Sequence, residues 1–320
     1  MYGLQDLKPR IMVTPTTVEC PVKGCCQSVA RQRSSFKREE RFRCPDHKIY
    51  ISPSTFDYDS EFDNLLWTTE DDLSLLQAIK TVKRESRISR DNSEDAVTWN
   101  VFHYLESANQ LDRFLSSITR KGPRQAELIY WSYSQKMNGA WSELNKARKE
   151  FGENIQHSSE PDLIAITERE LCFIEAKLTA TNNTVPSSSS SNNKYLIGGK
   201  KWFEQVFTSD FDTIAMKAKL FELFRFWLLG SWLASQTGRD FYLINITLSQ
   251  HEMDVEHRFR PYIQAGVNRF FVRITWEDVY KYILDKAPVN NDKNVILDYF
   301  RNKTIGYHYS ELQKAFMIDV

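Results

Sequence analysis

The chain has 320 residues, a formal net charge of zero, and 41% hydrophobic and 26% charged residues. This length suits one large domain or two modest ones, and the composition is that of a globular protein. A neutral chain has no global attraction to nucleic acid, so such a partner would have to be bound by local patches.

Two segments bear on localisation. Residues 1–13 lack the apolar core of a secretory signal. The most apolar run, residues 220–235, contains Glu222 and Arg225 and is too short and too charged to span a bilayer. We therefore expect a soluble, cytoplasmic protein without a membrane partner, and a core helix at 220–235.

Residues 1–60 are irregular, basic and rich in cysteine, which predicts a small metal-binding module. Clustered cysteines in a reducing compartment are metal ligands more often than disulfides. Cys20 and Cys25 form one closely spaced pair, Cys44 and His47 form another, and eighteen residues separate the two pairs. This spacing suits tetrahedral Zn²⁺. The expected ligands are Cys20, Cys25, Cys44 and His47. Cys26 could replace Cys25, although Gly24 favours a tight turn that ends at Cys25. Four protein ligands leave no open position, so the predicted zinc is structural.

The segment between the two ligand pairs, residues 26–43, is rich in Arg and Lys, with Phe36 and Phe42 interleaved. It has two interpretations of equal weight. It could contact phosphates of a nucleic acid, or it could be a solvated loop whose acids, Glu39 and Glu40, offset part of the charge. A second basic run at 80–90 could meet the same DNA.

The remaining chain, residues 61–320, alternates helices and strands, which predicts one α/β domain. Residues 93–108 read as a helix that is capped by Ser93 and carries an inward stripe that includes Val97, Val101 and Leu105. Further helices are expected at 141–151 and 277–286, a long helical region at about 200–237, and strands at 126–134, 240–249 and 269–276. The polar, low-complexity run 179–194 predicts a mobile loop.

Residues 159–178, SEPDLIAITERELCFIEAKL, combine two short apolar strands with a charged turn. If the turn centres on Glu168 and Arg169, Asp162 lies opposite Glu175, on the same face and about 5 Å away. The two-residue period of a strand places Lys177 on that face as well. A slip of one residue would separate the two acids, so the prediction depends on the register.

Two carboxylates at this distance repel each other and are costly to desolvate, and a divalent cation removes the conflict. Oxygen ligands suit Mg²⁺, which activates water and stabilises charge on phosphoryl oxygens. A nearby lysine can orient the attacking water. The pattern therefore predicts phosphodiester hydrolysis. The competing interpretation is an ordinary hairpin with a chance salt bridge between Glu175 and Lys177.

Pro161-Asp162 followed by Glu175-Ala176-Lys177 resembles the signature of the PD-(D/E)XK nuclease superfamily, over roughly residues 90–285. The wider sequence is also similar to a group of bacterial restriction-endonuclease-related proteins. The resemblance implies a restriction-endonuclease-like α/β fold, with a mixed central sheet flanked by helices. It also implies a Mg²⁺-dependent endonuclease that cuts double-stranded DNA in restriction or defence. Because two strands need two active sites, a homodimer is expected.

The resemblance also implies two outer site residues. Glu94, on the preceding helix, would assist the metal directly or through water, with Asp95 as a competing choice. Gln205 would orient Lys177 or a water, with Glu204 as its rival. Two other functions remain open: a structure-selective or repair nuclease on the same fold, and a zinc-stabilised DNA-binding protein that has lost activity.

Overall fold

The computed structural model describes residues 7–83, 86–154, 160–186, 192–264 and 266–318. These residues form a mixed α/β structure that divides into two compact units. Unit 1 comprises Met1–Leu73, Glu85–Ala108 and Trp276–Val320. Unit 2 comprises Ser74–Arg84 and Asn109–Thr275.

Unit 2 is built on a seven-stranded sheet in the order β11-β10-β9-β8-β5-β6-β7. Its strands are β5 (Glu127–Tyr130), β6 (Tyr133–Ser134), β7 (Gly139–Ala140), β8 (Leu163–Ile166), β9 (Glu170–Ala176), β10 (Asp240–Thr247) and β11 (Arg269–Thr275). Strand β10 is parallel to β9 and β11, whereas β8 is antiparallel to β9 and β5. The prediction of a mixed central sheet is therefore confirmed.

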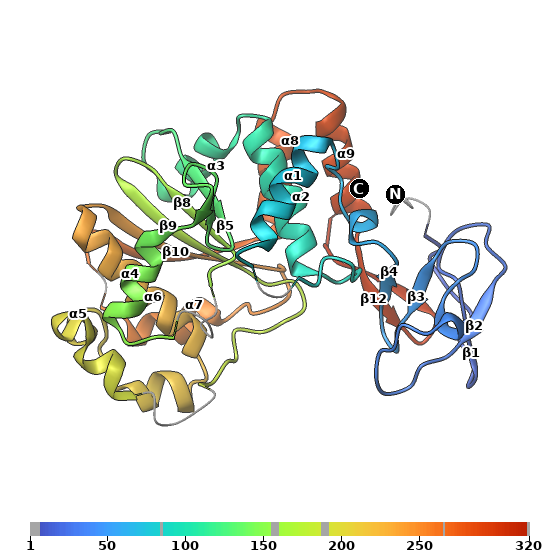
Figure 1. Ribbon diagram of the computed structural model, residues 1–320, viewed down its shortest axis with the longest axis horizontal. Helices are drawn as coiled ribbons and strands as arrows, with labels where there is room; N and C mark the ends of the chain where they lie inside the picture. The colour runs from blue at the N-terminus through green and yellow to red at the C-terminus, as the bar shows by residue number, and fades with distance from the viewer. Residues whose placement is uncertain (1–6, 84–85, 155–159, 187–191, 265, 319–320) are drawn as a thin grey trace. The chain divides into compact units, whose positions relative to one another are not determined.

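Helices flank this sheet, with α4 and α6 on one side and α3 on the other (Figure 1). The helices of unit 2 are α3 (Leu111–Thr119), α4 (Ser142–Glu150), α5 (Asn192–Val206), a π-helix (Asp212–Lys217), α6 (Phe221–Thr237), α7 (Val255–Phe259) and a 3₁₀ turn (Arg260–Tyr262). Helix α6 is the predicted core helix. Its Gly230 lies so close to the ring of Phe241 that a Cβ would come within 2.2 Å, so only glycine allows this approach of α6 to β10.

Unit 1 combines helices with three two-stranded antiparallel hairpins. The hairpins are β1 (Thr17–Glu19) with β2 (Ser28–Ala30), β3 (Ile49–Ile51) with β4 (Phe56–Tyr58), and β12 (Thr304–His308) with β13 (Glu311–Lys314). The helices are α2 (Glu94–Ser107), α8 (Trp276–Lys286), α9 (Asn291–Asn302) and short 3₁₀ turns at Glu40–Phe42 and Glu61–Asn64. Helix α1 (Glu70–Lys80) crosses the boundary between the units. Tyr307 joins the same apolar cluster as the first two hairpins, so the C-terminal hairpin completes their core.

A fully buried ion pair ties distant parts of unit 1 together. Lys303 Nζ lies 3.2 Å from Asp91 Oδ1, and both side chains are 0% exposed. Asp91 also accepts hydrogen bonds from the hydroxyls of Tyr58 and Thr304, and Lys303 donates to Asn64 Oδ1. Burial lowers the pKa of Lys303, while the charge of Asp91 opposes that shift.

We expect Lys303→Met to destabilise the protein by about 3–5 kcal/mol, because it leaves the Asp91 charge buried without its partner. Urea unfolding measures the loss. The double variant Lys303→Met/Asp91→Asn should recover part of it, and Lys286→Met, at an exposed lysine, serves as the control. Equal midpoints for Lys303→Met and Lys286→Met would show that the pair is not important for stability.

Most predicted elements are present: α2 with Ser93 as its N-cap, α4, β10, β11 and α8 all match. One prediction is wrong. The strand expected at 126–134 is split into β5 and β6, because Trp131 and Ser132 adopt left-handed φ angles of 44° and 71°. The helical region expected at about 200–237 is present and is divided into the end of α5, the π-helix and α6, which begins at Phe221.

Candidate catalytic and metal-binding sites

The β8–β9 hairpin has the predicted register. Leu163 pairs with Ile174, and Ile166 pairs with Leu171, around a turn at Glu168 and Arg169. Asp162 directly precedes β8, so it lies beside the end of β9. The backbone N–H of Ala176 donates to Asp162 Oδ2 at 2.8 Å, which joins the Pro-Asp and Glu-Ala-Lys segments directly.

Lys177 lies between two carboxylates. Its Nζ is 2.6 Å from Glu175 Oε1 and 2.8 Å from Glu222 Oε2, and the lysine side chain is 9% exposed. Glu222 belongs to the first turn of α6, where an acid is favoured by the helix dipole. The sequence analysis did not identify Glu222 as a site residue. The available signal was an acid within an otherwise apolar core helix.

The cluster therefore contains three acids, Asp162, Glu175 and Glu222, and one amine, that of Lys177. Burial raises the pKa of Glu175 well above its ordinary value; the charges of Glu222 and Asp162 raise it further, and Lys177 opposes them. Burial also acts to raise the pKa of Glu222, but its attraction to Lys177 prevails and lowers it. Among these four residues, negative charge exceeds positive charge.

One carboxylate oxygen of the cluster lacks a hydrogen-bond partner among the described residues. This atom is Glu175 Oε2, and it is buried. Buried polar atoms are nearly always paired, so this oxygen marks a place where a ligand could bind. Carboxylate oxygens are ligands that suit a hard divalent cation such as Mg²⁺, and Asp162 and Glu175 could supply them. Among the described residues, the group of three or more ligand side chains close enough to share an ion is the Cys20–His47 cluster, not these acids.

Trp131 holds the Asp162 carboxylate in place. Its indole Nε1 donates to Asp162 Oδ1 at 3.2 Å, and its backbone N–H donates to the Asp162 carbonyl at 3.0 Å. The left-handed φ of this tryptophan is unfavourable for a bulky residue and is maintained by its burial, at 1% exposure. The Nζ of Lys83, from the basic run 80–90, lies 4.3 Å from the centre of a Trp131 ring.

Part of the segment 179–194, for which a mobile loop is predicted, makes specific contacts near these residues. Asn182 is fully buried and donates to Asn245 Oδ1 and Glu252 Oε2, both at 3.0 Å. Thr184 Oγ1 accepts from the backbone N–H of Glu222 at 2.8 Å. Residues 182–184 are thus packed against the site, because asparagine and threonine side chains satisfy buried partners there. Residues 187–191 lie outside the described part of the chain.

The two predicted outer site residues, Glu94 and Gln205, lie on helices α2 and α5. Glu94 is the first residue of α2, in unit 1, and Asp95 accepts a hydrogen bond from the backbone N–H of Arg87. Gln205 and Glu204 are both exposed on α5, and the nearest charge to Glu204 is Lys201 at 3.7 Å. The helix residue that contacts Lys177 is Glu222. The roles of Glu94 and Gln205 stay predictions.

The four predicted zinc ligands converge. Their ligand atoms all lie within 4.8 Å of one another. Cys25 Sγ is 3.8 Å from Cys44 Sγ, and His47 Nδ1 is 3.7 Å from Cys20 Sγ and 3.6 Å from Cys44 Sγ. Ligands on a tetrahedral Zn²⁺ with usual bond lengths would be about 3.8 Å apart for two sulfurs and about 3.6 Å apart for sulfur and nitrogen. The cluster thus fits a zinc ion.

The local backbone explains the choice of ligands. Cys20 and Cys25 lie in the β1–β2 connection, where Gly24 has a φ of 75°, and Cys44 and His47 precede β3. Cys26, the alternative to Cys25, is exposed, and its sulfur points to the carbonyl of Gly24. Without a cation, burial raises the thiol pKa of Cys20 and Cys25, and a metal would reverse this by favouring thiolates.

Three arginines of the basic segment at 26–43 form ion pairs within unit 1. Arg38 pairs with Asp57 at 2.6 Å, and Arg43 pairs with Asp59 at 2.8 Å. Arg41 pairs with Glu39 at 2.8 Å. Both interpretations of the segment, as a phosphate-contacting patch and as a charged loop, stay predictions.

Comparisons of the chain with protein-family models, with curated proteins and with solved structures found no match. In the part of the chain that is described, no helix has the length and apolar character needed to cross a membrane. The functional argument therefore depends on the residues of the two sites.

Proposed function

We propose that the chain is a Mg²⁺-dependent endonuclease with a restriction-endonuclease-like fold, which hydrolyses DNA phosphodiester bonds in restriction or defence. The observation that supports this most is the group of Asp162, Glu175 and Lys177 at one end of a hairpin, with Glu175 Oε2 buried and unpaired. Carboxylates that can hold a divalent cation, beside an amine that can stabilise charge on phosphoryl oxygens, are a combination able to promote hydrolysis of a phosphodiester.

Each residue has a distinct role in this proposal. Asp162 and Glu175 would hold Mg²⁺, which supplies a Lewis acid for the phosphoryl oxygens and for water. Lys177, held by two carboxylates, would orient the attacking water and offset charge on the phosphate. Glu222 would fix the position of Lys177, a part that the sequence analysis assigned to Gln205.

The zinc cluster, Lys83 and a second copy of the chain would contribute to structure and DNA binding rather than to catalysis. Zn²⁺ at the Cys20–His47 cluster would be structural, because its four protein ligands complete a tetrahedron. Lys83, beside Trp131, would meet the phosphate backbone of double-stranded DNA near the scissile bond. A homodimer would supply the second active site for the second strand.

Incubation with supercoiled plasmid DNA tests the proposal. We expect nicked and linear products in Mg²⁺ and none in EDTA, with 5′-phosphate and 3′-hydroxyl ends. Cleavage of branched but not linear DNA would favour a structure-selective nuclease. DNA binding without any Mg²⁺-dependent cleavage would favour an inactive binding protein and contradict the proposal.

We expect Trp131→Phe to weaken Mg²⁺ binding by about 10- to 100-fold, because it removes the donor that orients the Asp162 carboxylate while keeping an aromatic ring. Titration calorimetry with Mg²⁺ measures the affinity. Trp202→Phe is the matched control, since it also removes an indole donor, to Ser231 Oγ, away from the acids. Equal Mg²⁺ affinities of Trp131→Phe and Trp202→Phe would show that Trp131 does not contribute to the metal site.

A further inference from the structure

The seven-stranded sheet ends in an edge strand, β11, which among the described residues pairs on its outer side with no other strand and forms one isolated bridge, between Arg269 and Gly266. Such edges are normally short, bulged, or interrupted by proline or lysine, because an open edge pairs with other chains. β11 has seven residues, RFFVRIT, without proline or lysine, and pairs with β10 over its whole length without a register shift. Arg273 does not guard the edge, since its guanidinium donates to the carbonyls of Leu248, His251 and Glu252.

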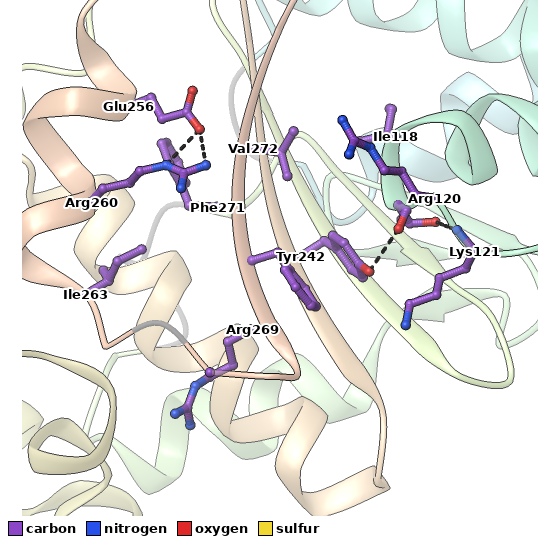
Figure 2. A pocket seen from close by; sticks show the side chains of 13 residues that line it. Ile118, Arg120, Lys121, Tyr242, Glu256, Arg260, Ile263, Arg269, Phe271 and Val272 are labelled. Carbon is purple, nitrogen blue, oxygen red and sulfur yellow. Dashed lines mark hydrogen bonds and ion pairs between the residues drawn. The ribbon is translucent and has the colours of Figure 1, made fainter.

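A hollow of about 810 Å³ follows this edge and lies on both of its faces. Four consecutive residues, Arg269 to Val272, line it. Neighbouring side chains of a strand point to opposite faces, so a hollow lined by all four must wrap around the edge. Figure 2 shows Arg260 and Ile263 on one side of β11, and Tyr242 and Arg120 on the other.

The hollow offers apolar surface mainly on one face, where the ring of Phe270 stacks on Tyr242, with centroids 4.6 Å apart, beside Ile118 at the end of α3. On the other face Phe271 and Ile263 are 4% and 8% exposed, so they add little free apolar surface. An extended peptide paired with β11 would present its side chains alternately to these two faces.

The charge of the lining is positive. It contains four cations, Arg120, Lys121, Arg260 and Arg269, and one acid, Glu256. Arg260 pairs with Glu256, and Lys121 lies 3.5 Å from Asp240. In the described part of the chain, Arg269 Nε is buried without a hydrogen-bond partner, and the Arg269 guanidinium lies over the ring of Trp202, 5.8 Å from its centre. This excess of positive charge favours acidic side chains in a partner.

We propose that β11 is a docking strand for an extended acidic segment of a partner protein, which adds to the sheet as an eighth strand. Backbone hydrogen bonds along β11 supply the pairing, and apolar side chains of the segment pack on the face of Phe270 and Tyr242. Its carboxylates pair with Arg269 and Arg120. The proposal is independent of DNA cleavage and uses none of the residues assigned to the catalytic cluster.

A phage library of random eight-residue peptides tests this directly, with the full chain as bait. We expect enrichment of sequences that alternate Asp or Glu with apolar residues. A synthetic peptide from that set should bind the wild-type chain at least tenfold more tightly than Arg120→Glu/Arg269→Glu. Lys136→Glu, at an exposed lysine outside the hollow, should leave the affinity unchanged.

A second version of the peptide, N-methylated at alternate residues, separates strand pairing from charge attraction and does not depend on the folding of any variant. It should lose binding although its charge is unchanged. The proposal is overturned if no acidic sequence is enriched, or if N-methylation has no effect. It is also overturned if the double arginine variant instead abolishes self-association of the chain or binding of an oligo-dT strand.

Discussion

Lys177→Met should lower the rate of Mg²⁺-dependent plasmid cleavage by about 10²- to 10⁴-fold, the range found when a positioned proton-transfer or charge-stabilising group is lost. The change removes the amine that lies 2.6 Å from Glu175 and 2.8 Å from Glu222 but keeps an unbranched side chain of similar length. The measurement is the initial rate of conversion from supercoiled to nicked plasmid.

The same variant should still bind Mg²⁺, because Asp162 and Glu175 are intact and one positive charge has been removed. Retained metal binding with lost cleavage distinguishes a role in chemistry from simple unfolding. Lys136→Met, at an exposed lysine that pairs with Glu127, is the control for loss of a lysine in unit 2. Cleavage by Lys177→Met at the wild-type rate would show that the Lys177 amine has no role in the reaction.

The second large effect concerns the zinc cluster. Cys44→Ser should abolish binding of one zinc per chain and unfold the two N-terminal hairpins, because structural zinc supplies about 10 kcal/mol or more of folding free energy in small modules. Cys44 Sγ lies close to both Cys25 and His47, so its loss opens the tetrahedron. Metal analysis and limited proteolysis of residues 1–60 measure the two effects.

Cys26→Ser is the matched control, since Cys26 is exposed and lies next to a proposed ligand. It should retain one zinc and wild-type resistance to protease. A purified chain without zinc that is nevertheless resistant to protease in these hairpins would contradict the zinc proposal. Equal zinc loss in the two variants would contradict the choice of Cys25 over Cys26.

The hairpin at the site was predictable because several local signals agree. Apolar residues on both strands and the charged turn at Glu168 and Arg169 favour one register, and that register brings Asp162 next to the end of β9. The zinc ligands were predictable for a similar reason, since their spacing in the sequence reflects the geometry of a tetrahedral ion. In both cases the prediction depends on residues that lie close together in the sequence.

Three features were missed because they depend on packing. Glu222 reaches Lys177 from a helix 45 residues later in the chain, and sequence periodicity does not show how α6 lies on the sheet. The left-handed turn at Trp131 is contrary to the preference of an aromatic residue and is stabilised by tertiary contacts. Asn182 was placed in a mobile loop on composition, whereas its partners Asn245 and Glu252 lie far along the sequence.

The most direct test of the central claim is a crystal soaked in Mn²⁺, an anomalous scatterer that replaces Mg²⁺ at oxygen-ligand sites. The account predicts an anomalous peak at metal–oxygen bonding distance, about 2.1 Å, from one oxygen each of Asp162 and Glu175. It also predicts that this peak is absent in Glu175→Gln. An ion that binds elsewhere, with no peak at these two carboxylates, would contradict the proposed nuclease site.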